Sequence, residues 1–240
     1  MVLLSFCMIF SAKIHFSRGF TALRRKESNK KPAKSVFSVQ KSLYRNTMEE
    51  KNDRQWKVLE SKYVIKRPWL TARVDKVQLP TGVVNDEYYV LEYPDWINVI
   101  AITEEGKFVL VRQYRHGIRR MCLELCAGVV DPSDKSPLEA ARRELWEETG
   151  YGGGQWSLLM KAAPNPGAMN NSTYCYLAEG VTQISTQHLE ATEDITVHLL
   201  NEQQVLELLE KDEIKQALMI APLYKYFYGK IGKNAPRSAE

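Results

Sequence analysis

Three glutamates, Glu144, Glu147 and Glu148, are the residues of this chain whose spacing most clearly suggests chemistry. If their segment is helical, the i, i+3 and i+4 spacing places all three on one face. Carboxylates held this close repel one another, so they either point into water or share a cation. Hard divalent cations prefer oxygen ligands, and Mg²⁺ usually combines a few carboxylates with substrate phosphate oxygens. The trio therefore predicts either a solvated acidic helix face or a divalent-metal site.

The segment 136–149 carries the signals of a helix that would present these glutamates. Ser136 suits the N-cap, Pro137 suits the first helical position, and Glu139 stands where a capping box needs an acidic residue. Gly150 follows at the point where a left-handed residue ends a helix. A separate apolar face, able to pack on a sheet, comprises Leu138, Ala141 and Leu145.

The rest of the chain must supply that sheet. Alternating or continuous apolar residues predict strands within 56–80, 83–94, 96–103, 107–115, 121–128, 156–163, 172–181 and 194–200. The segment 96–103 is almost wholly apolar, which is typical of a strand buried on both faces. Residues 201–228 read as two helices. The order of these elements predicts an α/β fold.

Charge separates the first residues from the rest. Residues 1–47 hold ten Lys and Arg against Glu27 alone, a net charge of +9, whereas the remainder holds 23 against 28 acids, a net charge of −5. This basic extension is a targeting peptide, a disordered tail, or sequence translated upstream of Met48, and we favour the last reading. Because the basic charge belongs to this extension, we expect no nucleic-acid partner for the folded body.

Composition predicts a protein that stays in the cytoplasm. No run approaches the roughly 18 apolar residues that span a bilayer, so we expect no membrane association. The four cysteines, which form no zinc-type cluster, read as reduced thiols and are Cys7, Cys122, Cys126 and Cys175. We expect a basic extension over 1–47, a β segment over 48–95, the main domain over 96–232 and a tail over 233–240.

The helical segment resembles the signature of a known family. From Arg143 to Tyr151 the chain reads RELWEETGY, which matches all seven specified positions in the second half of the Nudix box. The first half departs from that pattern. Lys135 stands where the box glutamate would fall, and Gly128 lies one residue before the position of the box glycine. One extra loop residue explains the offset, and Asp134 is the candidate substitute for the structural glutamate.

The resemblance extends beyond the box. Residues 109–132 resemble the ADP-ribose pyrophosphatase branch of Nudix hydrolases, and the similarity spans 55–228. It implies an α/β/α sandwich with a mixed sheet, preceded by a small antiparallel β segment that forms a homodimer. It also implies a site for Mg²⁺, with Mn²⁺ as the alternative. The implied ligands are Glu144, Glu147, Glu148 and the backbone carbonyl of Ala127.

Other residues are candidates for substrate binding and proton transfer. Arg115 is a candidate phosphate clamp because guanidinium matches phosphate oxygens in a bidentate manner, although a structural role is equally open. In the branch that the chain resembles, the general base comes from a loop late in the chain, which points to Glu193 first and Glu190 second, beside Glu148 at the metal. Flat aromatic platforms for a base are Trp56, Trp69 and Trp96, unless these tryptophans serve packing.

The resemblance implies hydrolysis of the pyrophosphate bond in a nucleoside diphosphate sugar. ADP-ribose, which would give AMP and ribose 5-phosphate, is the leading substrate. GDP-mannose, NADH and FAD are alternatives that differ in the base pocket. A module that senses a nucleotide without cutting it has no need of the intact glutamate trio. An isoprenoid diphosphate isomerase would place a reactive cysteine beside the metal, and the sequence shows none.

Overall fold

The structure is a computed structural model that describes residues 54–234, with side chains through residue 230. The expectations for residues 1–47, including Cys7, lie outside the described residues, as do residues 235–240 of the expected tail. None of the described helices is long and apolar enough to cross a membrane.

The first described strands form a separate three-stranded antiparallel sheet. Its strands are β1 (Lys57–Arg67), β2 (Leu70–Gln78) and β3 (Val84–Glu92), in the order β1-β2-β3. Every residue of β1 is exposed. The sheet contacts the rest of the chain through β3, where the Leu91 amide donates to the Ala168 carbonyl at 2.7 Å and the Tyr88 hydroxyl to the Gly167 carbonyl at 2.8 Å. This is the small antiparallel sheet that the resemblance predicted.

The main sheet has six strands in the order β7-β8-β4-β6-β5-β9. Its strands are β4 (Trp96–Thr103), β5 (Phe108–Arg115), β6 (Arg120–Val129), β7 (Tyr151–Ala162), β8 (Thr173–Gln183) and β9 (Ile195–Leu200). The pairing of β4 with β8 is parallel and the other pairings are antiparallel, so the sheet is mixed as expected.

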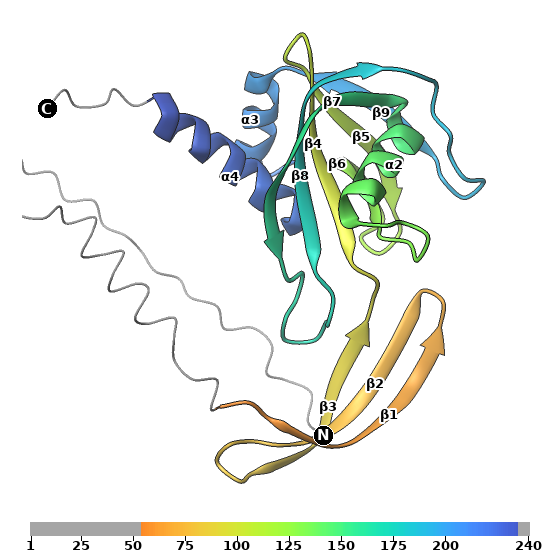
Figure 1. Ribbon diagram of the computed structural model, residues 1–240, viewed down its shortest axis with the longest axis vertical. Helices are drawn as coiled ribbons and strands as arrows, with labels where there is room; N and C mark the ends of the chain where they lie inside the picture. The colour runs from red at the N-terminus through yellow and green to blue at the C-terminus, as the bar shows by residue number, and fades with distance from the viewer. Residues whose placement is uncertain (1–53, 235–240) are drawn as a thin grey trace, which may run out of the picture. The chain divides into compact units, whose positions relative to one another are not determined.

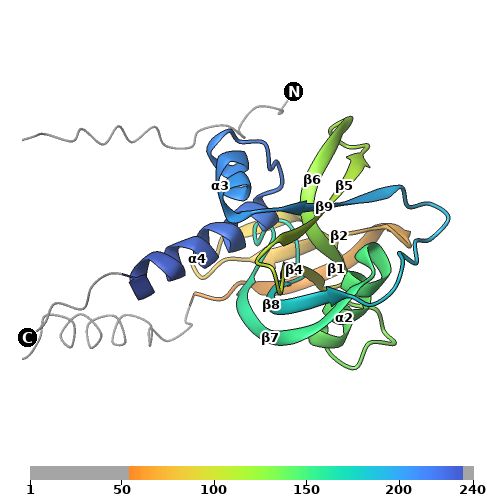
Figure 2. The ribbon, with the colours of Figure 1, turned by 90° about the horizontal axis from the view of Figure 1, so that it is seen from above.

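Helices cover both faces of this sheet, as Figures 1 and 2 show. The helix α2 (Pro137–Thr149) packs on one face, and α3 (Glu202–Glu210) and α4 (Ala217–Asn234) pack on the other. Alternate residues of β4 serve the two sides: Val99 joins the cluster under α2, whereas Ile100 joins the cluster under α3 and α4. The two apolar layers confirm the predicted α/β/α sandwich.

Two element ends differ from the prediction. Strand β7 begins at Tyr151, five residues before the expected start, because the glycine-rich segment pairs with β8 although glycines read as a loop. Gly154 has a φ of +70°, and a Cβ there would lie against the Glu179 carbonyl, so this irregular start needs glycine. Helix α4 continues to Asn234, past the point where the tail was expected.

Candidate active site

The helix α2 is built by the caps that its sequence predicts. The Ser136 hydroxyl accepts a hydrogen bond from the Glu139 amide at 3.2 Å, and Gly150 ends the helix with a φ of 75°. The reciprocal half of the predicted capping box differs: the Glu139 carboxylate accepts from the Lys135 amide at 3.3 Å, one residue earlier than expected. The helix is thus held at both ends in the register that its glutamates require.

Two of the three glutamates are buried. Glu144 is 9% exposed and Glu148 is 4% exposed, whereas the Glu147 side chain retains 32% exposure. The apolar face of the helix, including Leu145, packs on the sheet as predicted. A solvated acidic face is therefore wrong for Glu144 and Glu148, because neither carboxylate has free access to water.

Strand β6 lies directly under the buried carboxylates. The Ala127 amide donates a hydrogen bond to the Glu148 carboxylate at 3.1 Å. A Cβ at Gly128 would overlap the Glu144 carboxylate, so any other residue there would displace this carboxylate from its present position. Ala127 was predicted to contribute its carbonyl, but the contact in the structure is made by its N–H, and the carbonyl remains a predicted ligand.

Arg143 holds the acidic groups in one network. Its guanidinium donates to both oxygens of Asp134, at 3.1 and 2.9 Å, to Glu144 at 3.0 Å and to Glu147 at 2.9 Å. The predicted substitution is confirmed, because Asp134, and not Lys135, makes the supporting ion pair. Arg143 lowers the pKa of Asp134, which keeps that carboxylate charged.

Burial makes the charged forms of the two inner glutamates unfavourable. Desolvation raises the pKa of Glu148 to about 8 and that of Glu144 to about 7, the latter against the opposing effect of Arg143. The Glu193 carboxylate adds to both increases. Positive charge placed among these groups would favour their ionised forms.

The donor set suits a hard divalent cation. Such an ion binds carboxylate oxygens and neutralises their negative charge. Within residues 54–230, no three His, Cys, Asp or Glu side chains converge closely enough to complete a metal site by themselves. The Glu144 and Glu147 carboxylates instead accept hydrogen bonds from Arg143, and the Glu148 carboxylate accepts one from the Ala127 amide.

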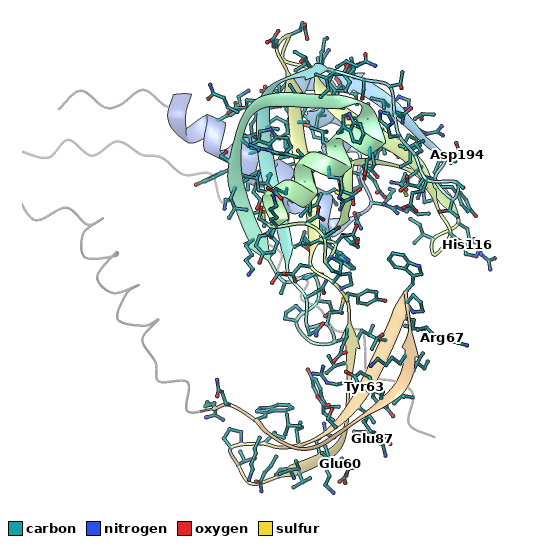
Figure 3. All side chains as sticks on the ribbon, turned by 45° about the vertical axis from the view of Figure 1, so that its right-hand side comes forward. Glu60, Tyr63, Arg67, Glu87, His116 and Asp194 are labelled. Atoms are coloured by element: carbon teal, nitrogen blue, oxygen red, sulfur yellow. The ribbon has the colours of Figure 1, made fainter. Side chains whose placement is uncertain are left out.

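The two candidate bases lie in the loop between β8 and β9 and are exposed to solvent. The Glu193 carboxylate accepts a hydrogen bond from the Glu190 amide at 2.9 Å, which caps a tight turn. Its negative charge adds to the raised pKa values of Glu144 and Glu148, two members of the acidic cluster that Glu144, Glu147 and Glu148 form on α2. Figure 3 labels its neighbour Asp194 at the right-hand edge of the view, above His116.

Arg115 is partly committed to a structural partner. Its Nε and Nη2 donate to the buried Glu124 carboxylate, at 3.0 and 2.5 Å, which leaves Nη1 for a substrate. The hydrogen bonds to Glu124 raise the pKa of Arg115 most, and the negative charge of Glu148 adds to the increase. Arg115 lines a hollow of about 300 Å³ together with Trp96, Ala127 and Gly128. This hollow is the candidate substrate pocket.

The other two tryptophans that were predicted as platforms for a base, Trp56 and Trp69, lie apart from that pocket. Trp56 packs edge-on against Tyr88, with ring centroids 5.6 Å apart, and Trp69 stands 77% exposed at the turn between β1 and β2. Of the three predicted aromatic platforms, the described chain places only Trp96 on the pocket wall.

Sequence reasoning missed a cysteine at the site. Cys126 is fully buried, and its thiol contacts the Glu148 carboxylate. Burial raises the pKa of this thiol well above its usual range, so it is a poor nucleophile. Its place next to Ala127 is the only signal that the sequence offered.

Comparison with known proteins agrees with this geometry. The model of the NUDIX domain matches residues 93–222, more than half of the chain. The chain belongs to the Nudix family. Residues 56–91 match the nucleoside diphosphate sugar hydrolase N-terminal domain, so this is a Nudix hydrolase of the nucleoside diphosphate sugar type. Nudix hydrolases generally depend on divalent metal cations.

This Nudix chain also resembles individual proteins. It is 32% identical to the methanol dehydrogenase activator of Bacillus methanolicus over 127 residues, 53% of this chain and 68% of that protein. It is 28% identical to the ADP-ribose pyrophosphatase of Bacillus subtilis over 167 residues, 67% of this chain and 89% of that protein. A solved ADP compounds hydrolase shares the fold, with a TM-score of 0.67 and 21% identity over 77% of this chain and 99% of that one.

Proposed function

We propose that this protein hydrolyses the pyrophosphate bond of ADP-ribose, giving AMP and ribose 5-phosphate, with Mg²⁺ as the metal and Mn²⁺ able to replace it. The observation that carries the proposal is the pair of buried glutamates, Glu144 and Glu148, beside a pocket in a chain of the nucleoside diphosphate sugar type. The Bacillus subtilis relative named ADP-ribose pyrophosphatase supports the choice of substrate.

Glu144, Glu147 and Glu148 would hold the metal, together with the Ala127 carbonyl. A divalent cation bound there would supply the positive charge that neutralises the phosphate oxygens as the bond breaks. The residues of the chain do the rest. Arg143 keeps the glutamates oriented, and the free edge of Arg115 can donate to a phosphate oxygen.

Hydrolysis then needs a water and a proton acceptor. The water oxygen bonds to phosphorus, the bond from that phosphorus to the bridging oxygen breaks, and the proton of the water passes to a base. We assign the base to Glu193 first and to Glu190 second. Glu193 is the better candidate because its charge reaches both buried glutamates.

The pocket wall favours a ligand with hydroxyl groups. Asn98, Thr173 and Gln216 line it, and each has a buried side-chain oxygen that finds no hydrogen-bond partner among the described residues. A buried acceptor without a donor is costly, and a sugar brings several hydroxyl donors. Rotation of Thr173 or Gln216 would turn its oxygen toward such a ligand. These acceptors support a sugar-bearing substrate over a plain inorganic diphosphate.

We also propose that the protein is a homodimer formed through the sheet β1–β3. Strand β1 exposes apolar side chains on both faces, including Val58, Tyr63 and Val64, each more than half exposed. Figure 3 shows Tyr63 projecting from this strand. A three-stranded sheet with so much exposed apolar surface is a typical association site. A second copy of the chain would cover it.

Sedimentation tests this dimer. The wild type should sediment as a dimer, and Val64→Glu should shift it to the monomer. Tyr228→Glu, at an exposed position of α4, should leave the dimer unchanged. A monomeric wild type would contradict the proposal.

Phosphate release after phosphatase treatment tests the activity. ADP-ribose, GDP-mannose, NADH and FAD would be compared at millimolar Mg²⁺ or Mn²⁺, with EDTA as the control. We expect ADP-ribose to be turned over fastest and EDTA to stop the reaction. Preference for GDP-mannose would correct the substrate. Metal-dependent binding of a nucleotide sugar without turnover would identify a sensing module.

A further inference from the structure

The loop between β8 and β9 is tied to the end of the helix that carries the glutamates. Figures 1 and 2 both show this loop passing close to α2. The Gln187 side-chain amide donates to the Glu148 carbonyl at 2.7 Å and to the Ile195 carbonyl at 3.1 Å. One side chain therefore joins the last turn of the helix, the loop and the first residue of β9.

A second tie follows at the next residue. The His188 amide donates to the Glu147 carbonyl at 2.8 Å, and the His188 ring stacks on the Trp146 ring with centroids 4.1 Å apart and planes 25° apart. Trp146 is 37% exposed, so it is not needed for the core and is available for this stack. The stack holds the loop at His188 against the last turn of α2.

These bonds use the carbonyls that a helix leaves unpaired. The last four carbonyls of an α-helix have no partner within the helix. Here the carbonyls of Glu147 and Glu148 accept from the loop, and Gly150 accepts from the amides of Ile184 and Ser185, at 2.9 and 3.1 Å. The residues whose side chains form the acidic cluster thus bind the loop through their main chain.

The two candidate bases lie between these ties. Glu190 is two residues beyond His188, and Glu193 is two residues before Ile195. Two residues of chain span at most about 7 Å, so neither glutamate can move far from an anchored residue. The turn closed by the Glu193 carboxylate and the Glu190 amide shortens the segment further.

We propose that Gln187 and His188 are positioning residues, Gln187 through its two hydrogen bonds and His188 through its stack on Trp146. Together they hold the segment 189–194 so that its glutamate faces the acidic cluster of α2. The inference rests on the proposed function, because it supposes that a loop glutamate accepts the proton of the attacking water. Neither positioning group touches the substrate in this scheme. Each acts by keeping the base at reaction distance, where an error of about 1 Å can cost about 100-fold in rate.

Kinetics of the full chain with ADP-ribose and Mg²⁺ test the tie made by Gln187. Gln187→Met keeps the length of the side chain and removes both hydrogen bonds. We expect kcat to fall about 10- to 100-fold, while KM and the Mg²⁺ concentration for half-activation stay within about twofold. Gln203→Met, the same change on the exposed surface of α3, is the matched control. An unchanged kcat for Gln187→Met would overturn the proposal.

The stack is tested by a loss and a rescue. His188→Ala removes the ring and keeps the main-chain bond, and we expect it to lower kcat severalfold. His188→Phe keeps a flat ring over Trp146 and should restore most of the lost rate. If both variants lose the same activity, the imidazole acts in another way and the stack is not a positioning device.

A double variant separates positioning from a general loss of stability. If Gln187 acts through the base, its substitution should add little to Glu193→Gln, or to Glu190→Gln if that variant proves the slower one. A purely structural role predicts that the two losses multiply. Multiplying losses would therefore overturn the proposal.

Hydrogen exchange measures how firmly the loop is held at Gln187 and His188, independently of catalytic activity. Peptides from 184–195 should exchange faster in Gln187→Met and His188→Ala than in the wild type, while peptides from β4 stay unchanged. Equal exchange would show that the tie is absent, whatever the activity. Faster exchange in a protein that cleaves no nucleotide sugar would show that the proposed function had failed and that the tie positions no base.

Discussion

Replacing Glu148 by Gln should remove hydrolysis and yet make the metal-free protein more stable at pH 8. Glu148 is 4% exposed, and burial raises its pKa to about 8 from the usual 4.5. The folded state therefore binds this proton more tightly than the unfolded state does. The part of the folding stability that depends on this proton is fully present below about pH 4.5. It is lost as the pH rises from there through about 8.

The magnitude follows from the two pKa values. A separation of 3.5 pH units, from 4.5 to about 8, corresponds to about 5 kcal/mol at about 1.36 kcal/mol per pH unit. Water entry and local relaxation reduce this cost, so we expect Glu148→Gln to gain about 2 kcal/mol at pH 8. For a domain of this size, that gain raises Tm by roughly 4–8 °C. The glutamine oxygen can still accept from the Ala127 amide, so the substitution removes charge with little change of shape.

Urea unfolding in EDTA at pH 5.5 and pH 8 measures this effect. The wild type should lose stability between these two pH values. Glu148→Gln should lose less, because only Glu144, whose pKa burial raises to about 7, still costs stability when it loses its proton in this range. Glu147→Gln is the matched control, because it removes a neighbouring charge whose side chain is 32% exposed. Mg²⁺ should restore the wild type at pH 8 and leave Glu148→Gln unchanged. Equal pH dependence in wild type and Glu148→Gln would refute the reasoning.

Two further substitutions test the parts that surround the glutamates. Asp134→Asn should lower the free energy of unfolding in urea by about 1 to 3 kcal/mol, because it breaks the nearly buried ion pair with Arg143. Asp131→Asn removes a carboxylate that is 48% exposed and should lower it by under about 0.5 kcal/mol. Equal losses would show that the loop pair has no special role. Gly128→Ala should lower activity at least tenfold and raise the Mg²⁺ requirement, because the added methyl displaces the Glu144 carboxylate. Gly117→Ala is its control, because the added Cβ meets no described atom within 4 Å. Equal activity of the two variants would contradict the assignment.

Local rules were sufficient where one element decides the outcome. The i, i+3 and i+4 spacing, Ser136 and Gly150 placed the glutamates on a capped helix because these effects act within a few residues. The pairing of Asp134 with Arg143 was also accessible, since counting along the box showed one extra residue in the loop. In each case the deciding contact lies fewer than about ten residues away.

Contacts between distant segments were not accessible in this way. The burial of Glu144 depends on Gly128 leaving room in β6, and no periodicity reports that approach. Arg115 read equally well as a phosphate clamp or a structural residue, because its partner Glu124 becomes a neighbour only when β5 and β6 pair. The early start of β7 is similar, since pairing with β8 outweighs the loop preference of its glycines.

The last turn of α2 holds both the acidic side chains and the loop between β8 and β9, so the position of each residue along this helix affects both. The side chains of Glu147 and Glu148 belong to the acidic cluster, while their carbonyls accept hydrogen bonds from the loop that carries the candidate bases. A helix fixes the angle between a side chain and its own carbonyl, so the distance from cluster to loop is set by one rigid turn. A one-residue slip of this helix would move both sets of groups together and leave neither in place. The caps at Ser136 and Gly150, which prevent that slip, therefore contribute to the chemistry although neither touches the substrate.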